Sequence, residues 1–218
     1  MFSNENPIFE FRGPWGVPIQ IGGSLMFLAL IFVPLGGAPD MVFYGLISFG
    51  MMIGSIYLHE LGHAWGCLIQ GVPVRRIMLY GGGGFCEHSA STTRYEDELI
   101  VAMGPIVNLV IWAVASLLTP FMVDPTLAWA MYWLAKMNLF LALFNLLPVM
   151  PLDGGKLFQL LLMRVLSPTA ATRVAGWVGL FITILWIPMM IVCYMTMGFV
   201  LIFIPPFALH VQMTRAAR

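Results

Sequence analysis

The residues most able to do chemistry are His59, Glu60 and His63, within the pentapeptide HELGH. On a helix, His59 and His63 are one turn apart on the same face, so both imidazoles can reach one metal ion. Glu60 lies beside them and can polarise a water molecule at an open coordination position. The motif therefore predicts two zinc ligands and a general base.

The position of the motif strengthens this interpretation. A five-residue pattern can arise by chance, but this one lies in an almost uninterrupted apolar stretch that begins near Met41. Charged and titratable groups in a bilayer-spanning segment are costly, and they usually face a cavity or a partner. We therefore expect catalytic chemistry at membrane depth.

The composition indicates an integral membrane protein. The 218 residues are 60% hydrophobic and only 9% charged, whereas soluble domains carry about a quarter charged residues. The first twenty residues show no removable signal peptide, so we expect the first span to act as the insertion signal. The net charge is zero and there is no basic run, which argues against nucleic acid as a partner. The three scattered cysteines are interpreted as small apolar residues.

The apolar segments predict an all-α polytopic membrane protein. A crossing needs about twenty apolar residues, and six candidates come near this length, although the first contains Pro34 and the last contains Pro205 and Pro206. We expect one domain over 1–218, with a three-helix catalytic core at about 41–160 and accessory helices at about 22–35 and 173–213. The six predicted spans are 22–35, 41–69, 98–119, 127–147, 173–195 and 196–213.

The basic residues predict the orientation. With a cytoplasmic N-terminus, every Lys and Arg except Lys136 falls on the cytoplasmic side, as the positive-inside rule requires. Lys136 follows Trp129, Tyr132 and Trp133, so we expect its ammonium to reach the opposite interface. We predict an inner cell membrane location, with both termini and the opening of the active site on the cytoplasmic side.

Two short segments favour β-strands on the cytoplasmic side. Residues 17–22 alternate between apolar and other side chains, and residues 72–80 are partly β-branched. An open strand edge offers unpaired backbone groups that can bind an extended peptide. We therefore expect a short sheet or hairpin beside the helical core.

Asp153 is the predicted third ligand. Catalytic zinc sites usually have three protein ligands and one open position. Asp153 is the carboxylate that follows the predicted fourth span on the correct side, in the sequence NLLPVMPLDGG at residues 145–155. Alone, it could simply cap a turn before Gly154 and Gly155. Beside two histidines that lack a third ligand, we favour metal binding.

HELGH in one span and NLLPVMPLDGG after a later one resemble the site-2 protease family of intramembrane zinc metalloproteases. Supporting matches are the sequences at 104–108, 138–145 and 81–84, so that the resemblance covers about residues 15–160. It implies that His59, His63 and Asp153 bind one Zn²⁺ and that Glu60 activates water. It also implies that the substrates are transmembrane segments of other proteins within the lipid bilayer.

The resemblance suggests substrate contacts too. The glycine-rich element, with Gly82 and Gly83, would lie near an unwound substrate strand. Asn108 and Asn145 match family asparagines that orient the substrate backbone or stabilise the oxyanion, and hydrogen bonding between packed spans is the equal alternative. Cys86 or His88 could occupy the open zinc position in a resting state, although an ordinary flexible loop is favoured.

The predicted function is zinc-dependent hydrolysis of peptide bonds in transmembrane segments. The main alternative is a membrane metal-ion transporter or metal-binding membrane protein, in which the same side chains would form a permeation site. An inactive scaffold is disfavoured because all four chemical residues are present. The sequence does not indicate an oligomeric state or the identity of a substrate.

Overall fold

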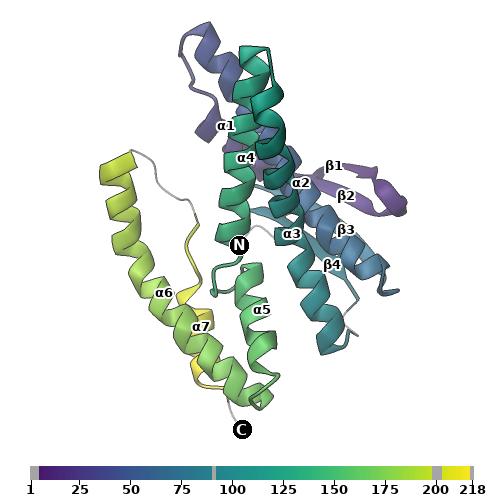
Figure 1. Ribbon diagram of the computed structural model, residues 1–218. Coiled ribbons are helices and arrows are strands. Elements are labelled where there is room, and N and C mark those ends of the chain that lie inside the picture. Colours follow the sequence, from purple (N-terminus) through teal and green to yellow (C-terminus); the bar gives the residue numbers. More distant parts are fainter. Residues whose placement is uncertain (1–4, 90–91, 198–202, 217–218) are drawn as a thin grey trace. The chain divides into compact units, whose positions relative to one another are not determined.

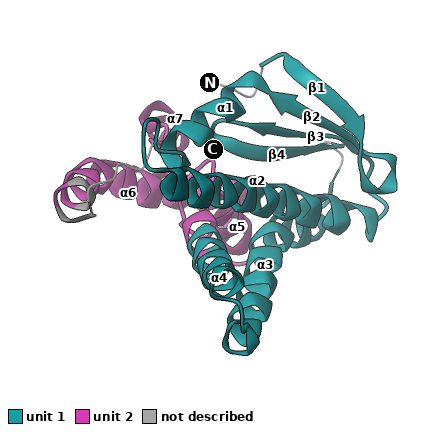
Figure 2. Cartoon of the chain, turned by 90° about the horizontal axis from the view of Figure 1, so that it is seen from above, with its two compact units in different colours: residues 1–142 teal, residues 143–218 magenta. Residues whose placement is uncertain are grey.

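The computed structural model describes residues 5–89, 92–197 and 203–216 (Figure 1). The chain forms two compact units, Met1–Ala142 and Leu143–Arg218 (Figure 2). The boundary falls near the end of one long helix, α4, which spans Pro125–Asn145.

A four-stranded sheet belongs to the first unit. The strand order is β1-β2-β3-β4, with an antiparallel pair at each end and a parallel pair, β2 and β3, in the middle. A parallel pair needs a crossover connection, and here α1 (Met26–Phe32) and α2 (Pro39–Leu68) supply it. The strands are β1 (Pro7–Arg12), β2 (Pro18–Gly22), β3 (Val74–Tyr80) and β4 (Gly83–His88).

One face of the sheet packs on α2. Ile19 and Ile77 are neighbours across the parallel pair, and both are fully buried in a cluster that includes Ala64 of α2. Strands at the two predicted segments, 17–22 and 72–80, are thereby confirmed. Strands β1 and β4 were not predicted.

The first unit also contains the long helix α3 (Arg94–Leu118) and most of α4. Helix α3 packs closely against α2, because a Cβ at Gly62 would lie 2.7 Å from the backbone oxygen of Met103. Small residues allow two helix backbones to approach in this way. Figure 2 shows the sheet on one side of α2 and α3 on the other. The sheet and α3 can therefore both reach side chains of α2.

The start of α3 is fixed by a capping box. The backbone N–H of Glu96 donates to the Thr93 hydroxyl, and the backbone N–H of Thr93 donates to the Glu96 carboxylate. These bonds satisfy two backbone donors at the helix start. They set the register of a helix that carries Ile100, Gly104 and Asn108 toward α2.

The second unit contains α5 (Asp153–Leu162), α6 (Pro168–Met197) and α7 (Phe207–Thr214). Helix α5 was not predicted, since its segment was expected to be a connection. Gly176 and Gly179 of α6 face α7, where a Cβ at Gly176 would lie 2.7 Å from Cβ of Met213. The glycines thus allow close packing of these two helices.

Within the described residues, four helices are long and apolar enough to cross a membrane: Pro39–Leu68, Arg94–Phe121, Pro125–Asn145 and Pro168–Val192. The prediction of six crossings is not confirmed. The predicted first span contains only a short apolar helix, Gly23–Phe32, and ten residues extend only about 15 Å.

The predicted last span, 196–213, lies partly outside the described residues. In its described part, residues 203–206 are not helical, and the helix α7 that follows has eight residues. Pro205 and Pro206 lack the N–H groups that a continuing helix needs.

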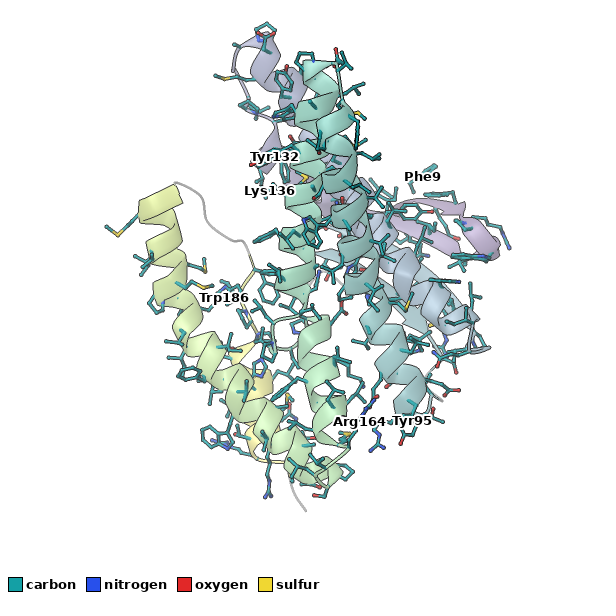
Figure 3. The ribbon with its side chains drawn as sticks, viewed as in Figure 1. Phe9, Tyr95, Tyr132, Lys136, Arg164 and Trp186 are labelled. Atoms are coloured by element: carbon teal, nitrogen blue, oxygen red, sulfur yellow. The ribbon has the colours of Figure 1, made fainter. Side chains whose placement is uncertain are left out.

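Lys136 lies on α4 with its ammonium nitrogen 5.3 Å from the centre of the Tyr132 ring (Figure 3). A cation over an aromatic face is favourable. The expectation that this ammonium reaches the opposite interface stays a prediction.

Candidate metal centre

His59 and His63 form a buried pair on α2. Their Nε2 atoms are 3.2 Å apart, and the two side chains are 6% and 8% exposed. Two nitrogens bound to one tetrahedral zinc ion at the usual distance would lie about 3.3 Å apart. The spacing therefore fits a single ion bound by both Nε2 atoms.

The other ring nitrogens determine the tautomers. Nδ1 of His63 lies 2.8 Å from the backbone oxygen of Ile100, and Nδ1 of His59 lies 2.5 Å from Oδ1 of Asn108. Because these oxygens accept hydrogen bonds, each Nδ1 carries the proton and each Nε2 carries a lone pair. Two lone pairs that face each other at this distance need a cation between them. The donor set therefore fits zinc.

A buried polar chain holds His59. The Asn108 amide nitrogen donates to Oδ1 of Asn138 at 2.8 Å, and the Asn138 amide nitrogen donates to the Ser55 hydroxyl at 2.9 Å. Asn108 and Asn138 are fully buried. This series of hydrogen bonds links α2, α3 and α4 and orients one of the two histidines, His59.

Sequence reasoning gave no site role to Asn138 or Ser55. The available signal was their polarity within apolar helices, since polar side chains in such segments usually hydrogen bond across helices. The oxygen and the nitrogen of the Asn108 amide both take part in this series of hydrogen bonds. The predicted contact between Asn108 and the substrate stays a prediction.

Gly104 of α3 lies directly against the two imidazoles. A Cβ at this position would collide with Nε2 of His63 and lie 2.6 Å from Nε2 of His59. Any larger residue would fill the space where the two nitrogens converge. This explains why a glycine opens the sequence Gly104-Pro-Ile-Val-Asn108.

The Glu60 side chain packs against β4. Its side chain is 4% exposed, and a Cβ at Gly84 would be 2.6 Å from its Cγ and 2.8 Å from its Oε1. The backbone of β4 thus passes within van der Waals distance of the predicted general base. Its glycine allows that approach.

Gly81 and Gly82 form a turn before β4, and Gly83 is the first residue of that strand. The Gly81 N–H donates to the Ser24 hydroxyl at 2.9 Å, and Gly83, with a φ of +122°, pairs with Tyr80. Only glycine adopts that φ readily. The predicted substrate-binding roles of Gly82 and Gly83 stay predictions.

Cys86 and His88 both lie on β4. The Cys86 thiol interacts with the Cys67 thiol, and this contact together with burial raises its pKa. Nδ1 of His88 lies 2.9 Å from the backbone oxygen of Ser89. Each of the two side chains therefore has a partner outside the histidine pair.

In the second unit, Asp153 is the first residue of α5. The preceding segment folds back on this helix start, so that a Cβ at Gly154 would lie 2.5 Å from the Leu147 oxygen and one at Gly155 would lie 2.6 Å from the Val149 carbonyl carbon. The two glycines therefore permit the tight approach that defines the position of Asp153. Asn145 is the last residue of α4, and its predicted substrate contact stays a prediction.

The sequence model of peptidase family M50 matches residues 47–124 and 121–186. These ranges include the histidine pair, Glu60 and Asp153. The chain belongs to peptidase family M50. The resemblance to site-2 proteases is thereby confirmed, and the four apolar helices agree with an integral membrane protein.

Relatives of this M50 chain include a zinc metalloprotease of Methanocaldococcus jannaschii, 27% identical over 165 residues, which are 75% of this chain and 48% of the relative. The stage IV sporulation protein FB of Bacillus subtilis is 29% identical over 120 residues, covering 54% of this chain and 41% of the relative. The chain thus spans about half the length or less of these curated relatives.

The solved structure of the site-2 protease from Methanocaldococcus jannaschii matches the M50 chain with a TM-score of 0.67 and 21% identity. The match covers 95% of this chain and 92% of that one. At this identity the likeness shows a shared fold.

Proposed function

We propose that this chain is a zinc-dependent intramembrane endopeptidase that hydrolyses peptide bonds in transmembrane segments of membrane proteins. The observation that carries the proposal is the buried pair of Nε2 atoms, 3.2 Å apart, on a helix long and apolar enough to cross a membrane. Glu60 follows His59 directly, and the family is one of peptidases.

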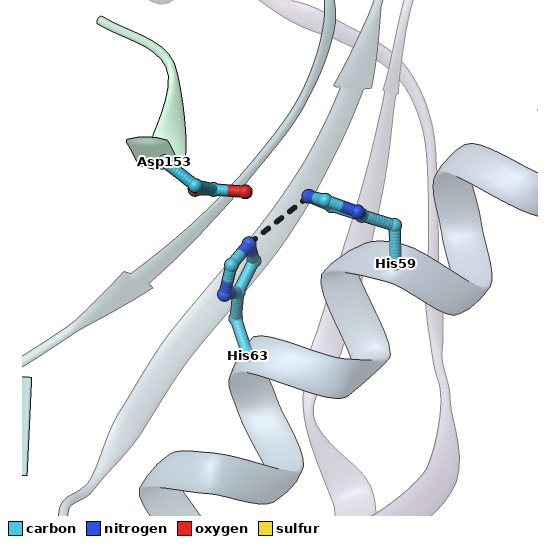
Figure 4. Close-up of side chains that lie close together, drawn as sticks. All are labelled: His59, His63 and Asp153. Carbon is cyan, nitrogen blue, oxygen red and sulfur yellow. Dashed lines mark hydrogen bonds between the residues drawn. The ribbon is translucent and has the colours of Figure 1, made fainter. Parts of the chain in front are cut away.

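Asp153 is the proposed third ligand. The proposal is supported by the chemistry of the three side chains drawn in Figure 4, because two imidazoles and one carboxylate form a donor set that suits a catalytic zinc ion. Two imidazoles and one carboxylate leave a fourth position for water, as in other catalytic zinc sites. A carboxylate also offsets part of the charge of a divalent ion that is otherwise bound by neutral imidazoles.

Glu60 acts as the proton carrier. Zinc, when bound, supplies a Lewis acid that brings the pKa of a bound water toward about 7 and polarises a carbonyl oxygen. The Glu60 carboxylate takes the proton of the attacking water and returns it to the nitrogen of the leaving amine. Its burial against β4 limits the access of bulk water to this transfer.

The substrate must be locally unwound, because helical hydrogen bonds otherwise occupy its backbone groups. Among the described strands, β4 lies at one edge of the sheet. An extended substrate that pairs with this edge would run past Glu60, since the backbone at Gly84 already lies against that side chain. Gly82, Gly83, Asn108 and Asn145 are the proposed contacts along this path.

The proposed arrangement in the membrane follows the charge pattern. The whole chain acts as one protease domain in the inner cell membrane, with both termini and the active-site opening on the cytoplasmic side. The support is the placement of all basic residues but Lys136 on that side in the predicted topology.

The test uses the full chain in liposomes together with a panel of single-span membrane proteins. Wild type should cleave at least one of them within its transmembrane segment, and Glu60→Gln should bind zinc but not cleave. Glu10→Gln, which changes an exposed carboxylate on β1, is the matched control and should cleave normally. Zinc-dependent flux into the liposomes without any cleavage would favour the transporter alternative.

A further inference from the structure

His210 is fully buried on α7, although no part of the proposed reaction uses it. Its Nε2 lies 3.3 Å from the backbone oxygen of Met150, three residues before Asp153. We propose that His210 is a positioning residue that holds the loop at residues 147–152, here called the aspartate loop, so that Asp153 keeps a geometry suited to metal binding. This inference rests on the proposed role of Asp153 as a ligand.

The aspartate loop is short and internally bonded. The Val149 N–H donates to the Leu147 oxygen at 2.7 Å, and the Leu152 N–H donates to the Val149 oxygen at 3.1 Å. The Gly155 N–H donates to the Leu152 oxygen at 3.0 Å and joins the loop to the first turn of α5. A shift at Met150 is therefore transmitted to Asp153 through few rotatable bonds.

The imidazole of His210 packs tightly against α6. A Cβ at Gly179 of α6 would collide with Nδ1 and Cε1 of the ring, so the ring lies flush against the α6 backbone. Because a carbonyl oxygen can only accept, Nε2 carries the proton and donates it to Met150. Within the described part of the chain, Nδ1 has no hydrogen-bond partner. The contact with Met150 is thus the polar interaction that the ring makes.

Helix α7 is itself tied to α6 at both ends. Before α7, the Trp186 indole N–H donates to the Phe203 oxygen at 2.7 Å, and the two rings pack with Phe144 (Figure 3 labels Trp186). After α7, Nε of Arg173 donates to the Ala216 oxygen at 2.9 Å. These hydrogen bonds fix the position of α7, and therefore of His210, relative to α6. On this inference, α6 and α7 serve to position the aspartate loop.

The expected effect is on metal affinity, because a positioning residue acts through the ligand and not on the substrate. Loss of an outer partner of a metal ligand typically weakens metal binding by about 10- to 100-fold. His210 acts through three intervening residues, so we expect the lower end, about tenfold.

The test compares His210→Leu, which removes the donor, with His210→Gln, whose amide nitrogen can still donate to Met150. The zinc dissociation constant is measured by chelator competition on the full chain in detergent, and the absorption spectrum of the Co²⁺-loaded protein reports the ligand geometry. We expect the Leu variant to bind zinc about tenfold more weakly with an altered Co²⁺ spectrum, and the Gln variant to resemble wild type.

Zinc affinity and Co²⁺ spectrum unchanged in the Leu variant would overturn the inference. Equal weakening in the Leu and Gln variants would also overturn it, because only general packing would then be involved. If the Leu variant does not fold, Gly179→Ala displaces the ring with His210 intact and should weaken zinc binding, whereas Gly50→Ala, with open space around it, should not. Normal affinity in Gly179→Ala would then count against the inference.

Asp153→Asn measured in parallel separates this inference from the proposed function. If that variant binds zinc as wild type does, the ligand role of Asp153 fails. If it loses zinc while His210→Leu keeps full affinity, only the role of His210 fails.

Discussion

The amide oxygen of Asn108 on α3 lies 2.5 Å from Nδ1 of His59 on α2, and this contact fixes which nitrogen of His59 is available to a metal. The Asn108 amide nitrogen is in turn bonded to Asn138 on α4. Three helices therefore cooperate to orient one imidazole, and a change in either asparagine should affect metal binding.

Asn108→Ala should weaken zinc binding by about 10- to 100-fold, because His59 loses the acceptor that sets its tautomer. Asn108→Asp keeps an oxygen for Nδ1 but loses the N–H that Asn108 donates to Asn138, so its zinc affinity should lie between that of the Ala variant and that of wild type. Zinc affinity measured by chelator competition checks both variants. Wild-type affinity in the Ala variant would show that the contact does not orient the ligand.

Gly104→Ala should abolish zinc binding, because the new methyl group would occupy the space where the two Nε2 atoms converge. The matched control is Gly50→Ala on α2, where a Cβ meets open space. The control should keep zinc and gain about 0.5–1 kcal/mol of helix stability. Metal content after purification and thermal unfolding measure the two effects, and zinc at wild-type level in Gly104→Ala would contradict the geometry of the site.

Gly84→Ala should lower the catalytic rate while zinc stays bound, since its Cβ would press on the Glu60 side chain and not on the histidines. A displaced general base typically costs about 10²- to 10⁴-fold in rate. The measurement is kcat for a cleavable membrane substrate together with metal content. Loss of zinc in this variant would mean that β4 supports the metal and not the base.

Glu87 should make the β3–β4 pair sensitive to acid. The hydrogen bond from Arg76, 2.7 Å long, lowers the pKa of the Glu87 carboxyl, with a further contribution from Arg75. Because the folded pKa lies below the unfolded one, this stabilisation is present above the unfolded pKa of about 4.3 and is lost as the pH falls through the folded pKa.

Glu87→Gln should therefore reduce hydrogen-exchange protection of β3 and β4 at neutral pH. The difference from wild type should shrink to nothing once the wild-type carboxyl is protonated. A difference that persists unchanged in acid would show that the ion pair is not its cause.

The proposed metal-binding residues could be named from the sequence because their chemistry is local. His59, Glu60 and His63 share one helical turn, and Asp153 stands out as a carboxylate beside two glycines. The partners of these residues could not be predicted, because hydrogen bonds such as those of Asn138 with Asn108 and Ser55 depend on helix rotation. An asparagine in an apolar segment has several possible partners, and the sequence does not choose between them.

Parts of the fold were missed for similar reasons. Strand β4 begins with Gly83 and Gly84, and glycine weakens a strand prediction. Helix α5 begins with Asp153-Gly154-Gly155 after Pro151, a sequence typical of a turn. The spans at 22–35 and 196–213 were predicted from apolar composition, which does not distinguish a crossing helix from shorter helices interrupted by proline.

The most direct test of the central claim is the zinc content per chain of purified wild type, Glu60→Gln and His63→Ala, determined by elemental analysis after removal of loosely bound metal. The histidine pair should hold one ion in wild type and in Glu60→Gln, and His63→Ala should lose most of it. A His63→Ala protein that retains one zinc per chain would contradict the assignment of the metal to this pair.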